Sequence, residues 1–356
     1  MKNLDKYLSL LTDEVDGLLL TSRYSRMYGA EFDIAEGVAI VTKVGCRYFT
    51  DSRYIESAQN NITGFTVLEM NRNNPYGKLL NDAISDFGVH CLGYEESYMT
   101  VAELMAFESK LNAKLVPFHE KIYSFRSVKE PWELARMREA QKITDQAFSE
   151  MLTKIKPGLT EKQLQAELVY SLLKNGADGM AFEPIVISGP NTSMPHGVPG
   201  DRVVQEGDFI TMDFGALYQG YCADMTRTVA VGYVTEEMEK VYNIVLQAQT
   251  AAIAATKPGV KGKEIDGVAR KIITDAGYGS YFGHGYGHSL GMECHEAPNC
   301  NPGGETVMEE NMVSSAEPGI YLPGKFGVRI EDTVIFTANG CENMTQSPKN
   351  LIILDI

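Results

Sequence analysis

The chain has 356 residues, with a hydrophobic fraction of 44%, a charged fraction of 22% and a formal net charge of −15. This length is long for a single core, so two domains are expected. The acidic balance excludes the basic face that nucleic-acid binding requires, and small or neutral substrates fit better. No stretch of sequence is long and apolar enough to span a bilayer, so we expect no membrane partner.

The first residues of the chain do not resemble a signal peptide. Asp5, Asp13, Glu14 and Asp16 interrupt the apolar run, and we therefore expect a cytoplasmic protein. The six cysteines lack paired zinc-knuckle spacing and are expected to be buried or idle thiols. Cys294, next to a histidine, is also expected to pack rather than to act as a nucleophile.

Residues 1–125 are expected to form an α/β domain of their own. Short β-rich runs at residues 17–20, 38–42 and 48–50 alternate with helical patterns at residues 51–59, 76–87 and 100–110. Asp51 is interpreted as the N-cap of the first of these helices. The pattern breaks near residue 125, and Pro131 suits the first position of a new helix. We therefore expect a second domain at residues 126–356.

The second domain contains an internal repeat. Lys156-Pro157-Gly158 recurs as Lys257-Pro258-Gly259, and at the same offset of 101 residues Lys162 matches Lys263, Leu164 matches Ile265 and Gly176 matches Gly277. This repetition indicates two copies of one supersecondary unit. In each copy a helix begins after the Pro-Gly turn and ends at a glycine suited to the left-handed C′ position. Thr160 and Gln163 form a candidate capping box, and an amphipathic helix precedes each copy.

A β-hairpin is expected after each repeated helix, and each hairpin carries one acidic pair. A two-residue turn at Tyr218 and Gln219 would place Asp213 opposite Asp224. A three-residue turn at residues 323–325 would place Glu317 opposite Glu331. Cross-strand Cβ atoms lie about 4.5 to 5.5 Å apart, so carboxylates this close repel unless a cation lies between them. One such pair could be solvated, but two at matching places in a repeat favour a metal centre.

The histidine-rich stretch at residues 283–295 lies between the two hairpins in sequence and holds three of the six histidines together with four glycines. We interpret His288 as a metal ligand beside the four carboxylates. Four carboxylates balance two divalent cations, and a bridging hydroxide would be a nucleophile because metal binding lowers the pKa of water to about 7. Oxygen-rich ligation with one imidazole suits Mn²⁺, Co²⁺, Zn²⁺ or Fe²⁺.

These motifs occur in a characteristic order: Met212-Asp213-Phe214-Gly215-Ala216, Asp224-Met225-Thr226-Arg227-Thr228, Gly283-His284-Gly285-Tyr286-Gly287-His288, His295-Glu296-Ala297-Pro298, Glu317-Pro318-Gly319 and Val328-Arg329-Ile330-Glu331-Asp332. The chain as a whole resembles the metal-dependent Xaa-Pro peptidases, which are the Xaa-Pro aminopeptidases and Xaa-Pro dipeptidases (prolidases) of the creatinase and methionine aminopeptidase superfamily. The resemblance implies an α/β (α+β) protein with a creatinase-type N-terminal domain and a pita-bread catalytic domain of pseudo-twofold symmetry.

The resemblance also implies a ligand set for two divalent metal ions per chain, with Mn²⁺ as the expected metal. Asp213 and Glu317 would each hold one side of the centre, and Asp224 and Glu331 would bridge the two ions. His288 would complete one coordination shell. Glu317 is also expected to carry a proton from the bridging water to the departing amine.

Further residues are implied to contact the substrate without binding metal. His196 and His295 would steady the tetrahedral intermediate. His284 would lie near the proline-side pocket, and Arg329 would orient that pocket and the bridging glutamate. Tyr286 occupies a place that in the family often holds a small residue such as threonine, so the shape of the pocket is left open.

The expected activity is that of an Xaa-Pro aminopeptidase, whose substrates are proline-containing peptides. We also expect the chain to form a homodimer. An Xaa-Pro dipeptidase is the alternative. A methionine aminopeptidase usually lacks so large an N-terminal domain. A creatinase-type amidinohydrolase or a non-catalytic binding module would normally have lost acidic ligands, and all five candidate ligands are present here.

Overall fold

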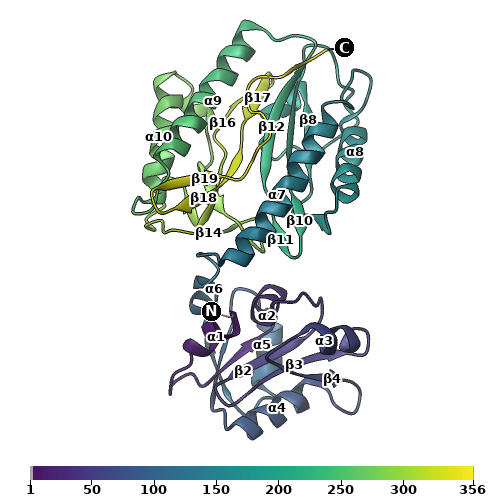
Figure 1. Cartoon of the computed structure of the whole chain (residues 1–356), viewed down its shortest axis with the longest axis vertical. Helices are drawn as coiled ribbons and strands as arrows, with labels where there is room; N and C mark the ends of the chain where they lie inside the picture. The colour runs from purple at the N-terminus through teal and green to yellow at the C-terminus, as the bar shows by residue number, and fades with distance from the viewer. Residues whose placement is uncertain (1–2, 356) are drawn as a thin grey trace. The chain divides into compact units, whose positions relative to one another are not determined.

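The computed structural model describes residues 3–355, which fold into two compact units that divide between Arg126 and Ser127 (Figure 1). In these residues no helix combines the length and the apolar character needed to cross a membrane.

The first unit is built on one mixed sheet of strand order β4-β3-β2-β1-β5-β6. Its strands are β1 (Gly17–Leu20), β2 (Val38–Thr42), β3 (Cys46–Asp51), β4 (Thr66–Met70), β5 (Cys91–Tyr94) and β6 (Lys114–Pro117). Its helices are α1 (Asn3–Ser9), α2 (Arg23–Ala30), α3 (Ile55–Asn61), α4 (Tyr76–Phe87), α5 (Val101–Glu108) and α6 (His119–Ser124). Apolar residues of α4, such as Leu80, pack on Leu19, Ile40 and Phe49 of the sheet.

The predicted strands at residues 17–20 and 38–42 and the predicted helix at residues 76–87 are confirmed. The assignment of Asp51 as an N-cap is wrong. Asp51 ends β3, and α3 begins four residues later after Tyr54. The Asp51 carboxylate instead accepts a hydrogen bond from the backbone N–H of Arg53 at 2.9 Å. A short acidic side chain stabilises such a local turn as readily as a helix terminus, which explains the error.

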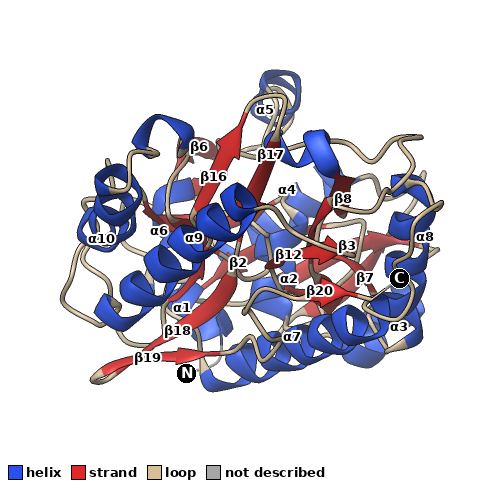
Figure 2. Ribbon diagram, turned by 90° about the horizontal axis from the view of Figure 1, so that it is seen from above, coloured by secondary structure: helices blue, strands red, loops and turns tan. Residues whose placement is uncertain are grey.

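Two helix pairs form the outer surface of the second unit. The first pair is α7 (Pro131–Met151) and α8 (Glu161–Lys174), and the second is α9 (Glu236–Ala255) and α10 (Gly262–Asp275). Pro131 occupies the first position of its helix and Thr160 forms a capping box with Gln163, as predicted. Helices α8 and α10 lie at opposite sides of this unit in both Figure 1 and Figure 2.

The predicted internal repeat is confirmed by the backbone. Gly158 N–H donates to the carbonyl of Val204 at 3.1 Å, and in the second copy Gly259 N–H donates to that of Met308 at 2.9 Å. Both repeated helices end at a left-handed glycine, with φ of 102° at Gly176 and 88° at Gly277. Positive φ costs a side-chain-bearing residue energy that glycine avoids.

Each helix pair covers its own hydrophobic core. Leu164, Leu168 and Leu172 of α8 pack with residues of α7, β9 and β12, whereas Val241 and Val245 of α9 pack with residues of α10, β16 and β17. The apolar stripes predicted for α7, α8 and α9 are buried. The strands between the helix pairs are β7 (Gly179–Met180), β8 (Ile185–Ser188), β9 (Phe209–Phe214), β10 (Ala216–Tyr218), β11 (Tyr221–Cys222), β12 (Met225–Val231), β13 (Gly287–Ser289), β14 (Glu296–Cys300), β15 (Val313–Ala316), β16 (Gly319–Leu322), β17 (Phe326–Arg329), β18 (Asp332–Thr337), β19 (Gly340–Asn343) and β20 (Ile353–Leu354). Short 3₁₀ turns lie at η1 (Gly189–Ser193) and η2 (Gly279–Tyr281).

The register of the second hairpin is confirmed and that of the first is corrected. Gly319 pairs with Arg329 across the turn at residues 323–325, and Ala316 pairs with Asp332 on the same line, so Glu317 and Glu331 lie opposite one another between the two ladders. In the first hairpin Asp213 pairs with Thr226 rather than with Asp224.

The cause of this shift is the position of the first turn. Tyr218 pairs with Tyr221, so the turn residues are Gln219 and Gly220, both with positive φ. A two-residue hairpin turn of this kind favours glycine at its second position, and the prediction placed Gly220 outside the turn. The resulting shift of two residues preserves the face to which each side chain points, because strand side chains alternate with a period of two. Asp213 and Asp224 therefore still reach one site.

Candidate metal centre

All nine residues predicted for the site line one cavity of about 510 Å³ in the second unit: His196, Asp213, Asp224, His284, His288, His295, Glu317, Arg329 and Glu331. The five candidate ligands come from separate strands or strand ends. Asp213 lies on β9, Asp224 directly precedes β12 and His288 lies on β13. Glu317 and Glu331 lie in the short links that follow β15 and β17. Both halves of the repeat therefore contribute to the same cavity.

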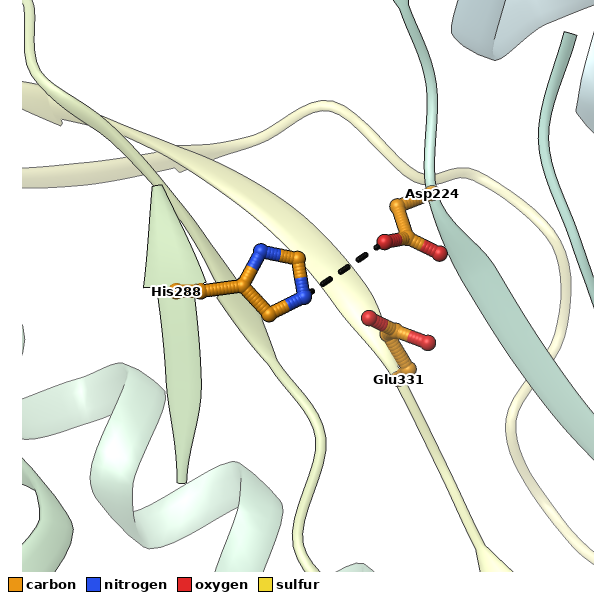
Figure 3. Close-up of side chains that lie close together, drawn as sticks. All are labelled: Asp224, His288 and Glu331. Carbon is orange, nitrogen blue, oxygen red and sulfur yellow. Dashed lines mark ion pairs between the residues drawn. The ribbon is translucent and has the colours of Figure 1, made fainter. Parts of the chain in front are cut away.

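Three of these side chains form a compact cluster. Asp224, His288 and Glu331 each present a ligand atom within 4.8 Å of the other two (Figure 3). His288 Nε2 lies 3.6 Å from Asp224 Oδ2 and 3.2 Å from Glu317 Oε1. Carboxylates and an imidazole nitrogen at such distances could hold a metal ion between them.

Hydrogen bonds prepare His288 for coordination. Its Nδ1 lies 3.0 Å from the carbonyl oxygen of Ser289, which can only accept, so Nδ1 carries a proton and Nε2, which lies at the cluster, is the nitrogen that would bind metal after losing its own proton. Metal-binding histidines commonly donate their second ring nitrogen in this way. Ser315 Oγ accepts from the backbone N–H of His288 at 3.0 Å and donates to Glu317 Oε1 at 3.1 Å.

Among the described residues, only one of the two carboxylate oxygens of Asp213 has a hydrogen-bond partner. Arg329 Nη2 donates to Asp213 Oδ2 at 2.5 Å. The other oxygen, Oδ1, is buried and has no hydrogen-bond partner among residues 3–355. A buried oxygen without a partner costs free energy, and a cation in the cavity would satisfy it. The donor set therefore fits divalent metal.

Arg329 organises the site differently from the sequence-based expectation. It contacts Asp213 directly and reaches Glu331 only through Thr226, whose hydroxyl accepts from Arg329 Nε at 3.0 Å and donates to Glu331 Oε2 at 2.6 Å. Arg329 Nη1 also donates to the hydroxyl of Tyr321 at 2.9 Å. The guanidinium thus links both acidic pairs.

Sequence reasoning missed Thr226, Ser315 and Tyr321. The Tyr321 hydroxyl links two predicted residues, because it contacts His284 Nε2 at 2.8 Å as well as Arg329. The position of Tyr321 two residues after Gly319, in the hairpin that follows Glu317, was the available signal. Tyr286, by contrast, does not shape the cavity, since its side chain is buried in the core of the second repeat.

Crowded charge perturbs the acidic groups. Burial raises the pKa of Asp224 to about 8, and the neighbouring charge of Asp213 adds to the effect. Burial and the charge of Asp224 raise the pKa of Glu331 well above its usual range. Burial opposes ionisation of His288 as well, but its contact with Glu317 raises the pKa of His288 to about 9. In the metal-free protein, bound protons reduce the repulsion between the crowded carboxylates, and divalent cations would replace these protons.

The remaining histidines and Cys294 surround the ligands. Burial lowers the pKa of both His284 and His295, so their rings are neutral near pH 7. The His295 ring packs on the His288 ring with 4.2 Å between centroids. Cys294 Sγ donates to Asp224 Oδ2 at 3.1 Å, and burial raises the pKa of this thiol well above its usual range. A protonated thiol is a poor nucleophile, which agrees with the packing role predicted for Cys294.

Comparison with known proteins identifies the family. Residues 135–338 match the model of metallopeptidase family M24, and residues 3–128 match the creatinase/prolidase N-terminal domain. The chain belongs to metallopeptidase family M24. The expected architecture of a creatinase-type domain followed by a catalytic domain of this family is confirmed. As an M24 metallopeptidase, the protein is an enzyme whose family uses divalent metal ions.

This M24 metallopeptidase is similar over most of its length to named relatives and to solved structures. It is 40% identical over 268 residues to a protein named Xaa-Pro dipeptidase from Pyrococcus horikoshii, covering 74% of this chain and 76% of that protein. A structure titled Xaa-Pro dipeptidase from Bacillus anthracis superposes with a TM-score of 0.95 at 38% identity, covering 99% of both chains. A structure titled X-Pro aminopeptidase from Thermotoga maritima superposes with a TM-score of 0.93 at 34% identity, covering 98% of this chain and 99% of that one.

Proposed function

We propose that the protein is an Xaa-Pro aminopeptidase with two metal ions, which hydrolyses the bond between an N-terminal residue and a following proline. The observation that supports this proposal most strongly is the convergence of four carboxylates and His288 on one cavity, together with the buried Asp213 Oδ1, which has no hydrogen-bond partner among residues 3–355. The similarity to proteins named Xaa-Pro dipeptidase and X-Pro aminopeptidase supports the substrate class.

The five ligand candidates, Asp213, Asp224, His288, Glu317 and Glu331, would hold two divalent cations. Four negative charges balance two such ions, and oxygen-rich donors with one imidazole suit Mn²⁺, with Co²⁺, Zn²⁺ and Fe²⁺ as further candidates. Bound cations would supply an activated water as nucleophile and polarise the scissile carbonyl. The remaining chemistry belongs to the protein's own side chains.

Proton transfer falls to Glu317. Burial raises the pKa of Glu317, but its hydrogen bond to His288 and the charge of His288 lower it to about 2, so Glu317 is ionised near neutral pH in the metal-free protein. Glu317 would take a proton from the attacking water and pass it to the departing prolyl nitrogen. His196 is exposed at the wall of the cavity, and His295 packs against His288, so both could donate hydrogen bonds to the developing oxyanion.

The residues that contact Tyr321 support the assignment of one side of the cavity to the proline of the substrate. His284, Tyr321 and Arg329 form a continuous hydrogen-bonded chain, with contacts of 2.8 Å and 2.9 Å. The rigid wall formed by these side chains could receive a ring with fixed φ and no N–H, which most peptidases reject.

Charge at the cavity wall favours longer peptides over dipeptides. The free carboxylate of an Xaa-Pro dipeptide would add a negative charge to this acidic cavity, and a cationic side chain would stabilise it. Arg329 is the one lysine or arginine among the described residues that line the cavity. Its three nitrogen atoms already donate to Asp213, Tyr321, Thr226 and the carbonyl of Pro195. A dipeptidase remains the second candidate, because similar proteins carry that name.

A panel of peptides tests the proposal. Ala-Pro-Ala and Ala-Pro should be hydrolysed and Ala-Ala-Ala should be a poor substrate, with the tripeptide cut at least as well as the dipeptide. Hydrolysis of Ala-Pro alone would make the enzyme a dipeptidase. Much faster hydrolysis of Met-Ala-Ser than of both proline peptides would replace the proposal with a methionine aminopeptidase.

A further inference from the structure

A fully buried ion pair lies beside the turn that leads to His295. Lys129 Nζ donates to Glu296 Oε2 at 3.0 Å, and only 1% of each side chain is exposed. Removing two charges from water costs free energy that their attraction often fails to recover, and an apolar pair of similar volume can fill such a space equally well. Stability alone therefore does not account for this pair.

Glu296 closes the turn that leads to His295. Its Oε1 accepts from the backbone N–H of Met292 at 3.1 Å and of Glu293 at 3.2 Å. The packing is tight, because a Cβ added at Gly291 would lie 2.8 Å from Glu296 Oε2. The carboxylate thus holds the backbone of this turn from the inside.

The same turn carries two side chains that touch the candidate ligands. Cys294 contacts Asp224 through its thiol, and the ring of His295 packs on the ring of His288. Glu296 directly follows His295 and begins β14, the strand that pairs with the His288 strand. A displacement of the Glu296 carboxylate would therefore move the His295 ring relative to the centre.

Lys129 anchors the turn to the beginning of α7. Its backbone N–H donates to the carbonyl of Asn311 at 3.0 Å. In the first turn of α7, Glu133 accepts from the hydroxyl of Tyr221 at 2.8 Å, and Trp132 packs edge-on against the same ring. The ammonium of Lys129 is therefore held in a rigid part of the fold, and through Glu296 it sets the position of the turn.

We infer that Lys129 and Glu296 are positioning residues for hydrolysis, which act by holding His295 against the substrate side of the metal centre. The inference rests on the proposed function, because it assigns His295 to the reacting carbonyl. A misplacement of about 1 Å near the reacting atoms can cost roughly 100-fold in rate, so a buried pair that fixes a turn can control turnover without touching substrate.

The test removes both charges together. Lys129→Met/Glu296→Gln preserves side-chain shape and removes both charges of this pair, whereas either single change leaves one of them buried and can prevent folding. The double variant should bind as much Mn²⁺ per chain as the wild type, with kcat on Ala-Pro-Ala reduced roughly 10- to 100-fold and KM changed less than about threefold. The single variant Lys129→Arg, which keeps a positive charge opposite Glu296, should retain most of the wild-type kcat. Unchanged kcat in the double variant would overturn the inference.

A second comparison separates positioning from general structural damage. If the pair acts through His295, the double change should reduce kcat by less than about twofold in a His295→Ala background. Losses that multiply would show independent effects and would contradict the inference. The matched control is Glu150→Gln/Lys174→Met, which removes a 3.1 Å ion pair between α7 and α8 and should leave kcat within about twofold of the wild type.

A readout without substrate keeps this test distinct from that of the proposed function. In the zinc-loaded protein, the ring ¹H–¹⁵N signals of His295, assigned with His295→Ala, should be single in the wild type and broadened or split in the double variant. Identical His295 signals in both proteins would refute the positioning role. Failure of the wild type to cut Xaa-Pro peptides would instead count against the proposed function.

Discussion

Arg329 binds one carboxylate oxygen of Asp213 at 2.5 Å and leaves the other, buried oxygen without a partner among the described residues. The guanidinium thereby fixes the orientation of Asp213, which lines the cavity. Because both acidic pairs connect to Arg329, directly or through Thr226, this residue couples the two halves of the repeat at the centre.

Arg329→Lys should therefore weaken metal binding while keeping the positive charge. A lysine cannot donate to Asp213, Thr226 and Tyr321 from one rigid planar group. Loss of such a supporting contact typically costs about 10- to 100-fold in metal affinity. Calorimetric titration with Mn²⁺ measures the effect. Arg138→Lys, at an exposed pair with Glu342, serves as the control, and equal affinities in all three proteins would contradict this role.

Asp224→Asn should lower metal occupancy well below two ions per chain. The change keeps the size of the side chain but removes one charge from a cluster in which Asp224 lies within 4.8 Å of His288 and Glu331. Elemental analysis after equilibration with Mn²⁺ and gel filtration gives the stoichiometry. Two ions held as tightly as in the wild type would exclude Asp224 from the bridging position.

The metal-free protein should become less stable as the pH rises from about 5 to 9. The folded-state pKa of Asp224 is raised to about 8 and that of His288 to about 9, so the native state binds more protons than the unfolded chain over this range. Each group stabilises the fold below its unfolded pKa, and this contribution disappears as the pH passes the folded value. Saturating Mn²⁺ should remove the trend in Tm. A Tm of the chelated protein that rises across this range would contradict the electrostatic account.

Gly267 of α10 and Gly277, which follows the end of that helix, should respond in opposite ways to alanine. Gly277 has a φ of 88°, so Gly277→Ala should destabilise the protein by about 1 kcal/mol. Gly267 lies inside the same helix, and a Cβ there would meet nothing within 4 Å. Gly267→Ala should stabilise it by about 0.5 to 1 kcal/mol. Urea denaturation measures both, and equal effects would show that backbone conformation is not the cause.

The five candidate ligands line one cavity, as the sequence predicted, because the repeat and the strand periodicity strongly constrain where they lie. A shift of two residues in the first hairpin left Asp213 and Asp224 on the same face, so the error in register did not affect the site. The second hairpin had an unambiguous turn at residues 323–325, and its register followed by counting.

Residues that support the ligands could not be found in this way. The contact between Tyr321 and Arg329 joins neighbouring strands, but the contact between Thr226 and Glu331 joins residues 105 positions apart. Lys129 and Glu296 are 167 positions apart, and neither lies in a periodic pattern that marks it as buried. Such pairs depend on the packing of distant segments, which composition and spacing do not encode locally.

We propose that two metal ions at this centre are needed for hydrolysis of the bond before proline. The most direct measurement is the rate of Ala-Pro-Ala hydrolysis by chelated protein during stepwise addition of Mn²⁺. We expect no hydrolysis in metal-free protein and a rate that reaches its plateau at two equivalents of Mn²⁺ per chain. Full activity in the metal-free protein would contradict it.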